Sequence, residues 1–120
     1  MQHIRVLIAD DRLSSSDGLK ALLATRSEVD IVGEAADGRE AVELVEMRRP
    51  DVVIMDVRMP GINGLEATRV IKDRWPEIKV IVLTMYPSHQ TEALTAGADA
   101  FLVKGCTADD LLKAILKPKE

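Results

Sequence analysis

The chain has 120 residues, 47% of them hydrophobic and 30% charged, a balance typical of one globular domain with its own core. Its net charge is −4 and it has no basic cluster, which argues against nucleic-acid binding by this chain alone. No apolar run approaches the roughly 18 residues of a membrane span. The single cysteine excludes an internal disulfide and favours a reducing compartment. We therefore expect one cytoplasmic domain over residues 1–120, with no membrane association.

Apolar spacing predicts strands and helices that alternate along the whole chain. The expected strands are Ile4–Ala9, Asp30–Ala35, the stretch that starts at Val52, Lys79–Leu83 and Ala100–Val103. The expected helices are Leu13–Thr25, Arg39–Arg49, Leu65–Trp75, Ser88–Ala96 and Ala108 to about Lys117. Alternation of this kind with short loops predicts an α/β fold, a doubly wound parallel sheet with helices on both faces.

Turn and capping residues mark the ends of these elements. Pro50 and Pro76 end the second and third expected helices. The start of the first helix stays open, because any residue in Ser14–Asp17 could cap it. Gly97 is the expected C-cap of the fourth helix, and Thr107 the expected N-cap of the fifth. With three aromatic residues in the chain, the core must be aliphatic.

The run that starts at Val52 is continuously apolar up to the carboxylate of Asp56. Such a run is typical of a strand buried on both faces of a parallel sheet. Asp56 follows where the strand emerges at its carboxyl end. Ligands and chemistry gather at that edge in open α/β sheets. Asp56 is therefore the first candidate for a functional residue.

Polar residues also follow other strands. Asp10 and Asp11 end the first, Thr84 follows the fourth and Lys104 the fifth. If the first and third strands are neighbours, three carboxylates crowd together and raise one another's pKa unless a cation neutralises them. Mg²⁺ suits such oxygen ligands. Lys104 adds a second positive charge and Thr84 a hydroxyl donor.

This set of groups suits phosphoryl chemistry. A metal, an ammonium and a hydroxyl can each stabilise one oxygen of a transferring phosphoryl group. Asp56 can itself be the nucleophile and form an acyl phosphate. One aspartate at a strand end is more often a turn residue or a cap. The joint arrangement argues against that reading, although neither common glycine-rich phosphate loop is present.

Several pieces of the chain, in order, resemble the receiver domain of two-component response regulators. The pieces are Val6–Asp11, Asp56–Gly64, Leu83–Thr84, Ala96–Ala98 and Phe101–Lys104. The Ile-Ala-Asp-Asp start and the Arg-Met-Pro-Gly block look most like the NarL/FixJ-like class. The resemblance covers essentially the whole chain. It implies a flavodoxin-like (βα)5 fold with strand order 2-1-3-4-5.

The resemblance also implies a role for each acidic residue. Asp56 is the expected phosphoacceptor, taking the phosphoryl group from the phosphohistidine of a histidine kinase or from a phosphotransfer protein. Asp11 is expected to ligate Mg²⁺ directly, and Asp10 directly or through water. Asp56 and the backbone carbonyl of Arg58 complete the expected metal ligands.

Thr84 and Lys104 are expected, from the same resemblance, to contact the phosphoryl group. Phe101 stands at the switch position and is expected to turn inward as Thr84 moves. This movement is expected to change the partner-binding surface made by the last two helices and the strand between them. Homodimerisation is one expected outcome. The implied output is regulation of transcription through a DNA-binding domain that this chain does not contain.

Two other functions compete with that of a phospho-accepting receiver. A phosphorylation-independent interaction module with a receiver fold is the alternative, and the complete set of aspartates, threonine and lysine argues against it. An enzyme with an external substrate needs a lid or a substrate pocket, and no insertion is large enough to form one. We therefore expect the chain to catalyse only its own phosphorylation and dephosphorylation.

Some positions depart from the family pattern. The stretch from Thr84 to Phe101 is shorter than expected, so the fourth helix or the loop before it should be shortened. Gly105 follows Lys104 where many receivers carry a proline, and Met85 is expected to narrow access to the phosphate.

Four further residues have minor or local expected roles. Arg58 and Tyr86 lie two places beyond Asp56 and Thr84 and are expected to shield the acyl phosphate. His3 and His89 are isolated and are expected to have no metal role.

Overall fold

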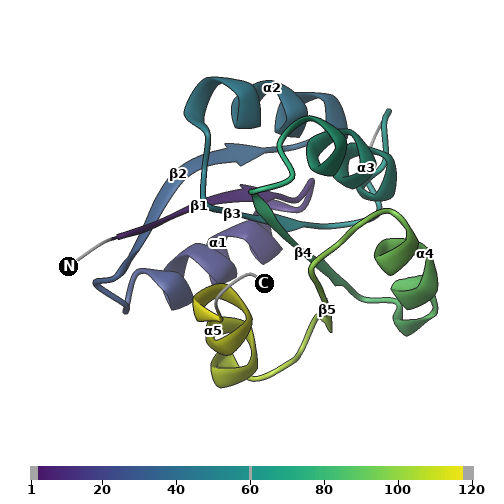
Figure 1. Cartoon of the computed structure of the whole chain (residues 1–120). Helices are drawn as coiled ribbons and strands as arrows, with labels where there is room; N and C mark the ends of the chain where they lie inside the picture. Colours follow the sequence, from purple (N-terminus) through teal and green to yellow (C-terminus); the bar gives the residue numbers. More distant parts are fainter. Residues whose placement is uncertain (1–2, 60, 118–120) are drawn as a thin grey trace.

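The computed structural model describes residues 3–59 and 61–117, with the backbone alone at 13–16. Pro60 and Pro118, which the sequence marks as turn residues, lie outside this part. The strands are β1 (Ile4–Ala9), β2 (Val29–Ala35), β3 (Val52–Met55), β4 (Lys79–Thr84) and β5 (Ala100–Val103). They form one parallel sheet in the order β2-β1-β3-β4-β5 (Figure 1). The predicted strand order is therefore confirmed.

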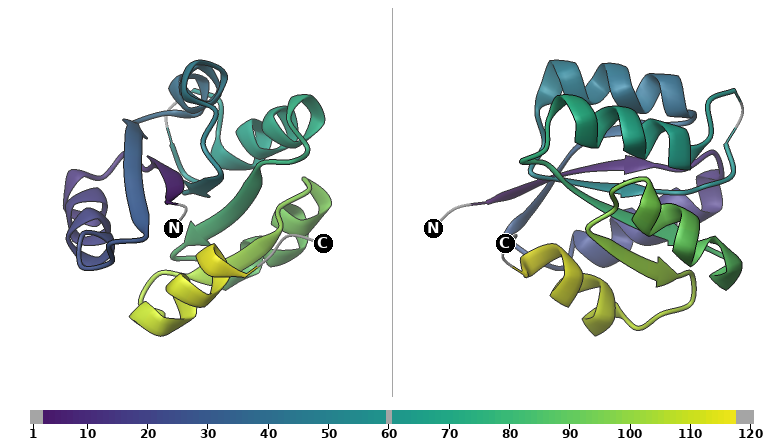
Figure 2. Two further views of the ribbon diagram at one scale, coloured as in Figure 1. Left: turned by 60° about the vertical axis from the view of Figure 1, so that its left-hand side comes forward. Right: turned by 45° about the vertical axis from the view of Figure 1, so that its right-hand side comes forward.

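The helices lie on both faces of this sheet. They are α1 (Leu13–Leu23), α2 (Gly38–Arg48), α3 (Gly64–Arg74), the 3-10 turn η1 (Pro87–His89), α4 (Gln90–Thr95) and α5 (Ala108–Leu116). Helices α1 and α5 cover one face, and α2, α3 and α4 the other (Figure 2). None of these helices, within the described ranges, has the length and apolar character needed to cross a membrane.

Two aliphatic clusters fill the spaces between the sheet and its helices. One joins β-strand residues such as Leu7 and Val53 to Ala41 and Ile71 of α2 and α3. The other joins alternate strand residues, among them Ile54, to α1 and α5. Burial on both faces explains why β3 is continuously apolar. Among the described aromatic residues only Trp75 is buried, so the expected aliphatic core is confirmed.

One predicted helix cap is confirmed and two differ. The Thr107 side chain accepts the N–H of Asp110 at 3.0 Å, as predicted. The C-cap of α4 is Ala96, and Gly97 (φ +102°) follows it in the left-handed region. The N-cap of α1 is Arg12, not a residue of Ser14–Asp17. Arg12 donates its N–H to Asp10 Oδ1 at 2.9 Å, so Asp10 holds the extended backbone that leads into the helix.

The segment after β4 is the least regular part of the sheet's surroundings. The sequence predicts one helix over Ser88–Ala96, but the structure has η1 followed by α4, which has only six residues. The other α-helices have nine to eleven. Pro87 stands at the start of η1, where its missing N–H and fixed φ suit a tight turn. The stretch expected to be shortened therefore consists of a 3-10 turn and a short helix.

Two glycines fix the loop that follows β3. A Cβ on Gly64 would lie 1.7 Å from the carbonyl oxygen of Asp56, and one on Gly38 would lie 2.1 Å from that of Ile62. Gly64 also donates its N–H to the Val57 carbonyl at 2.8 Å. Close backbone approach thus holds the loop against the starts of α2 and α3. This contact sets the position of the Asp56 main chain.

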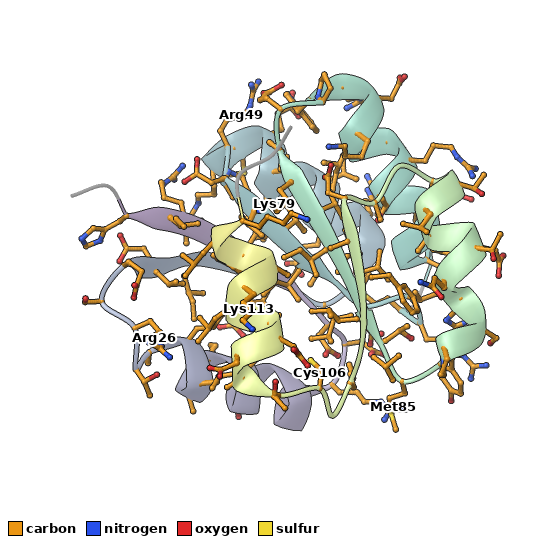
Figure 3. All side chains as sticks on the ribbon, turned by 60° about the horizontal axis from the view of Figure 1, so that its bottom comes forward. Arg26, Arg49, Lys79, Met85, Cys106 and Lys113 are labelled. Carbon is orange, nitrogen blue, oxygen red and sulfur yellow. The ribbon has the colours of Figure 1, made fainter. Side chains whose placement is uncertain are left out.

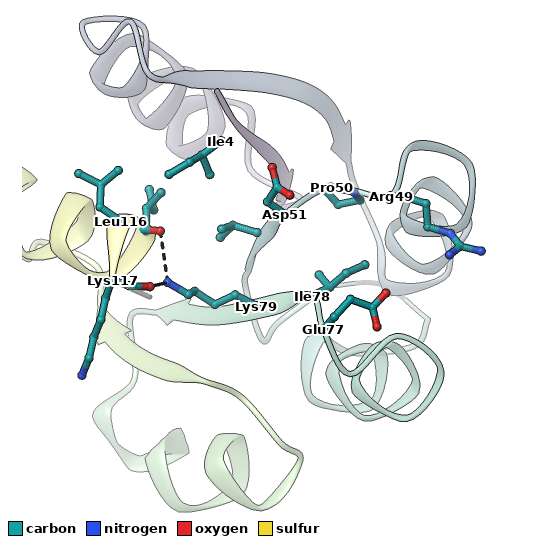
Figure 4. A pocket seen from close by; sticks show the side chains of 11 residues that line it. Ile4, Arg49, Pro50, Asp51, Glu77, Ile78, Lys79, Leu116 and Lys117 are labelled. Carbon is teal, nitrogen blue, oxygen red and sulfur yellow. Dashed lines mark hydrogen bonds between the residues drawn. The ribbon is translucent and has the colours of Figure 1, made fainter. Parts of the chain in front are cut away.

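A buried lysine joins the sheet to the end of α5, at the edge opposite Asp56. Lys79 Nζ donates to the carbonyls of Ala114 (2.8 Å), Ile115 (3.2 Å) and Lys117 (Figure 4). These carbonyls have no helical partner, so the ammonium caps the helix. Burial lowers the pKa of Lys79. The residues around it line a pocket of about 360 Å³ at this edge.

Candidate functional site

Three carboxylates meet at the carboxyl ends of β1 and β3. These strands are neighbours with Ala9 opposite Met55, and Asp56 donates its N–H to the Ala9 carbonyl at 2.9 Å. Asp10 and Asp56 therefore leave the sheet side by side. One side-chain oxygen from each of Asp10, Asp11 and Asp56 lies within 4.8 Å of the others. The predicted crowding of carboxylates is confirmed.

Lys104 brings a positive charge into this cluster from the end of β5. Its ammonium lies 2.9 Å from Asp10 Oδ2 and 3.2 Å from Asp56 Oδ2. The backbone N–H of Lys104 donates to the Thr84 carbonyl at 2.7 Å, which extends the pairing of β4 with β5. Gly105 makes the next turn at φ +99°. Lys104 is thus held without a following proline.

The Asp56 carboxylate is buried, with 7% of the residue exposed. Its Oδ1 accepts the N–H of Val57 at 2.8 Å, and its Oδ2 faces Lys104. Burial raises the pKa of Asp56 above its ordinary value; the Lys104 charge opposes this, and the Asp10 charge adds to it. The ionised form is therefore short of solvation, and a further cation or hydrogen-bond donor would stabilise it.

The acidic cluster fits a hard divalent cation. Its donors are carboxylate oxygens, which Mg²⁺ prefers, and Asp11 is exposed to solvent while Asp10 is half-buried. Exposure on one side leaves room for the waters that Mg²⁺ retains. Asp10, Asp11 and Asp56 are the residues that could hold the ion.

A small pocket of about 80 Å³ opens beside the cluster. It is lined by Asp11, Arg12, Asp56, Arg58, Met85, Tyr86 and Lys104. Two contacts join pairs of these lining residues. The Arg58 guanidinium lies 4.2 Å from the centre of the Tyr86 ring, and Arg12 Nη1 lies 3.6 Å from Met85 Sδ. Met85 is 52% exposed and lies at the outer edge of the molecule (Figure 3).

The Thr84 hydroxyl lies in this region but is hydrogen-bonded within its own segment. Thr84 is 1% exposed. Its Oγ1 lies 3.4 Å from His89 Nδ1 and accepts the N–H of Tyr86 at 3.4 Å. Phe101 lies opposite Val82 in β5, half-buried against the cluster that includes Trp75. The structure therefore brings together the side chains of Asp10, Asp11, Asp56 and Lys104, whereas the side chains of Thr84 and Phe101 contact other residues.

Sequence reasoning missed three contributors to this region. The N–H of Val57 supports Asp56, and Arg12 both bonds to Asp10 and lines the pocket. Backbone donors leave no sequence signal. His89 is isolated from other histidines in the sequence, yet its ring also packs edge-on against Tyr86, with centroids 5.5 Å apart. Its only signal was its place in the shortened stretch after Thr84.

The fold and this site define a flavodoxin-like receiver, a parallel sheet whose carboxyl edge carries an acidic cluster beside a lysine. Residues 6–116 match the response regulator receiver domain family, and the chain belongs to that family. As predicted, it is the receiver domain of a two-component response regulator, and its relatives are of the NarL/LuxR type.

Named relatives agree with this assignment. The chain is 42% identical to the transcriptional regulatory protein DegU of Brevibacillus brevis over 114 residues, which cover 93% of this chain and 48% of DegU. It is 37% identical to the response regulator protein VraR of Staphylococcus saprophyticus, over 95% of this chain and 56% of VraR. The chain thus spans about half the length of these relatives.

A solved structure shares both the fold and part of the sequence. The signal receiver domain of the putative response regulator NarL from Mycobacterium tuberculosis superposes with a TM-score of 0.90 at 32% identity. The match covers 97% of this chain and 95% of that one.

Proposed function

We propose that the chain accepts a phosphoryl group on Asp56, in the cytoplasm, from the phosphohistidine of a histidine kinase or of a phosphotransfer protein. The observation that carries the proposal is the placement of Asp56. It is a buried carboxylate that faces the Lys104 ammonium at 3.2 Å and shares a 4.8 Å cluster with Asp10 and Asp11. A carboxylate serving only as a turn residue needs none of these neighbours.

The reaction forms one bond and breaks one. An oxygen of the Asp56 carboxylate attacks phosphorus, and the bond from phosphorus to the donor nitrogen breaks with its electron pair left on the imidazole. Negative charge is shared among the phosphoryl oxygens during transfer. Lys104 can stabilise one of them, and the Thr84 hydroxyl, once it moves towards the group, can stabilise another.

Mg²⁺ would be held by Asp11, Asp10, Asp56 and the backbone carbonyl of Arg58. When bound, it supplies positive charge beside the transferring group. This chain's own contribution is to present the oxygens from one sheet edge and to neutralise part of their charge with Lys104. Transfer of this kind changes only the chain itself, so no external substrate is turned over.

The signal then leaves through the surface of α4, β5 and α5. Thr84 moves towards the phosphoryl group, and Phe101 turns inward into the space beside it, which shifts the population of that surface. DegU and other relatives are named as transcriptional regulatory proteins. We extend this to the present chain, with output through a DNA-binding domain outside it and homodimerisation as one form of the active state.

A mass measurement tests the proposal. The wild-type chain is incubated with a small phosphodonor, with Mg²⁺ or with a chelator, and intact mass is recorded. One phosphoryl adduct is expected with Mg²⁺, little with the chelator, and none for Asp56→Asn. Asp73→Asn, an exposed aspartate on α3, should behave like wild type. Absence of any adduct on the wild type would leave only the interaction module.

A further inference from the structure

His89 is the one described side chain that contacts both the Thr84 hydroxyl and the ring of Tyr86. Its Nδ1 lies 3.4 Å from Thr84 Oγ1, and its ring meets the Tyr86 ring edge-on. The Arg58 guanidinium in turn lies 4.2 Å from the centre of the Tyr86 ring. A continuous row of contacts therefore runs from Thr84 to the rim of the pocket beside Asp56.

We propose that His89 is a positioning residue that holds the Thr84 hydroxyl in its resting orientation and thereby restrains phosphorylation. The inference rests on the proposed function, because it concerns the same transfer to Asp56. The neutral imidazole, with its proton on Nε2, accepts the hydroxyl proton of Thr84 at Nδ1. Thr84 must give up this bond before its hydroxyl can donate to a phosphoryl oxygen.

The geometry suits a restraint that can be released. A heavy-atom distance of 3.4 Å lies at the long end of hydrogen bonding, so the bond is weak. Thr84 is almost fully buried, and in the described part of the chain its hydroxyl has only His89 and the Tyr86 N–H as partners. A neutral hydrogen bond of this kind shifts an equilibrium by roughly two- to tenfold.

The short segment after β4 is what brings His89 to Thr84. Pro87 starts η1, and His89 donates its backbone N–H to the Tyr86 carbonyl at 3.1 Å. This tight turn folds His89 back over the strand end, and α4 starts immediately at Gln90. A movement of Thr84 away from His89 therefore changes the position of the first residue of α4. That residue lies on the surface proposed to signal.

Single substitutions separate this role from a structural one. His89→Leu removes the acceptor and is expected to raise the rate of phosphorylation by a small phosphodonor about threefold. His89→Asn keeps a hydrogen-bonding atom at the place of Nδ1 and is expected to restore a rate near wild type. His3→Leu, at an exposed histidine paired with Asp30, is the matched control and should have no effect.

A double-mutant cycle shows whether His89 acts through Thr84. In a Thr84→Val background, His89→Leu is expected to leave the rate unchanged, because the bond is already lost. A rate increase that persists in that background would overturn the inference, as would equal rates for wild type and His89→Leu. In both cases the wild type still takes up the phosphoryl group, so the proposed function stands.

A second measurement needs no phosphorylation. Nitrogen-15 NMR of the unmodified protein at about pH 8, where imidazole is neutral, reports which nitrogen carries the proton. We expect His89 to be protonated at Nε2, and Thr84→Val to shift its Nδ1 resonance while that of His3 stays fixed. If the His89 Nδ1 resonance is the same in wild type and in Thr84→Val, the inference is overturned. This holds even if neither protein takes up a phosphoryl group.

Discussion

The Lys104 ammonium reaches across β4 to lie 3.2 Å from the carboxylate of Asp56 at the end of β3. The same ammonium lies 2.9 Å from Asp10. One cation is therefore shared by two carboxylates that come from adjacent strands. It offsets part of their mutual repulsion while leaving Asp11 exposed for another cation.

Removal of this charge should impair phosphoryl transfer. In Lys104→Met the buried carboxylates lose their cation, and the developing charge on the phosphoryl group loses a stabilising partner. The rate of adduct formation with a small phosphodonor should fall about tenfold or more, as measured by intact mass. Lys113→Met, at an exposed lysine of α5, is the control. An unchanged rate for Lys104→Met would remove Lys104 from the proposed mechanism.

The stability of the fold should depend on the ionisation of Asp56. Burial raises the pKa of Asp56 in the folded chain, so the folded state binds the proton more tightly than the unfolded state does. Ionisation at neutral pH therefore lowers the free energy of unfolding. Asp56→Asn should raise that free energy by about 1 kcal/mol near neutral pH. The gain should shrink as the pH falls through the pKa of Asp56.

Urea denaturation in a chelator, from about pH 4 to about pH 8, checks this prediction. Asp73→Asn, which replaces an exposed aspartate of α3, serves as the control and should show no comparable gain. A lower stability of Asp56→Asn near neutral pH would mean that the Lys104 contact outweighs burial.

The pair of Arg58 and Tyr86 should lengthen the life of the acyl phosphate. Their contact at 4.2 Å joins two residues that line the pocket beside Asp56, and we expect it to limit the access of water to the acyl phosphate. Arg58→Ala or Tyr86→Ala should shorten the half-life of the phosphorylated chain roughly two- to tenfold, because a cation–π contact of this kind is modest. Decay of the mass adduct measures it, with exposed Arg69→Ala as control. Equal half-lives would refute the shielding role.

Two glycine substitutions should have opposite effects on stability. A Cβ on Gly64 would lie 1.7 Å from the Asp56 carbonyl oxygen, so Gly64→Ala should lower the free energy of unfolding by about 3 kcal/mol. Gly18 lies within α1 with open space around it, so Gly18→Ala should raise it by about 1 kcal/mol. Urea denaturation measures the free energy of unfolding of each variant and of the wild type. Equal stability of Gly64→Ala and wild type would show that the loop can move.

Much of the fold could be predicted because the spacing of apolar residues along the sequence reflects helix periodicity and the burial of strands. The apolar run before Asp56 predicted a central strand, and alternation of elements predicted a parallel sheet. The neighbouring positions of β1 and β3, which bring Asp10 to Asp56, came from the family resemblance. The predicted start of α1 at Leu13 agrees with the structure, but its N-cap, Arg12, could not be predicted, because it depends on a contact with Asp10 that lies outside helical periodicity.

The acidic cluster was predictable, whereas its surroundings were not. Carboxylates at the ends of adjacent strands must meet, whatever the loops do. The contact of His89 with Thr84 depends on a tight turn at Pro87 and on side-chain direction. Likewise, the support that the Val57 N–H gives to Asp56 comes from backbone geometry that any residue type could provide. Such contacts do not correspond to any pattern of residue types in the sequence.

The central claim is that Asp56 carries the phosphoryl group, and chemical trapping tests it most directly. The wild-type chain is treated with a small phosphodonor and Mg²⁺ and then with borohydride, which reduces an acyl phosphate to an alcohol and releases phosphate. Peptide mass spectrometry then locates the reduced residue. The account predicts homoserine at position 56 and no reduction at Asp10 or Asp11. Reduction at another residue, or none at Asp56 in a chain that has gained the phosphoryl mass, would contradict it.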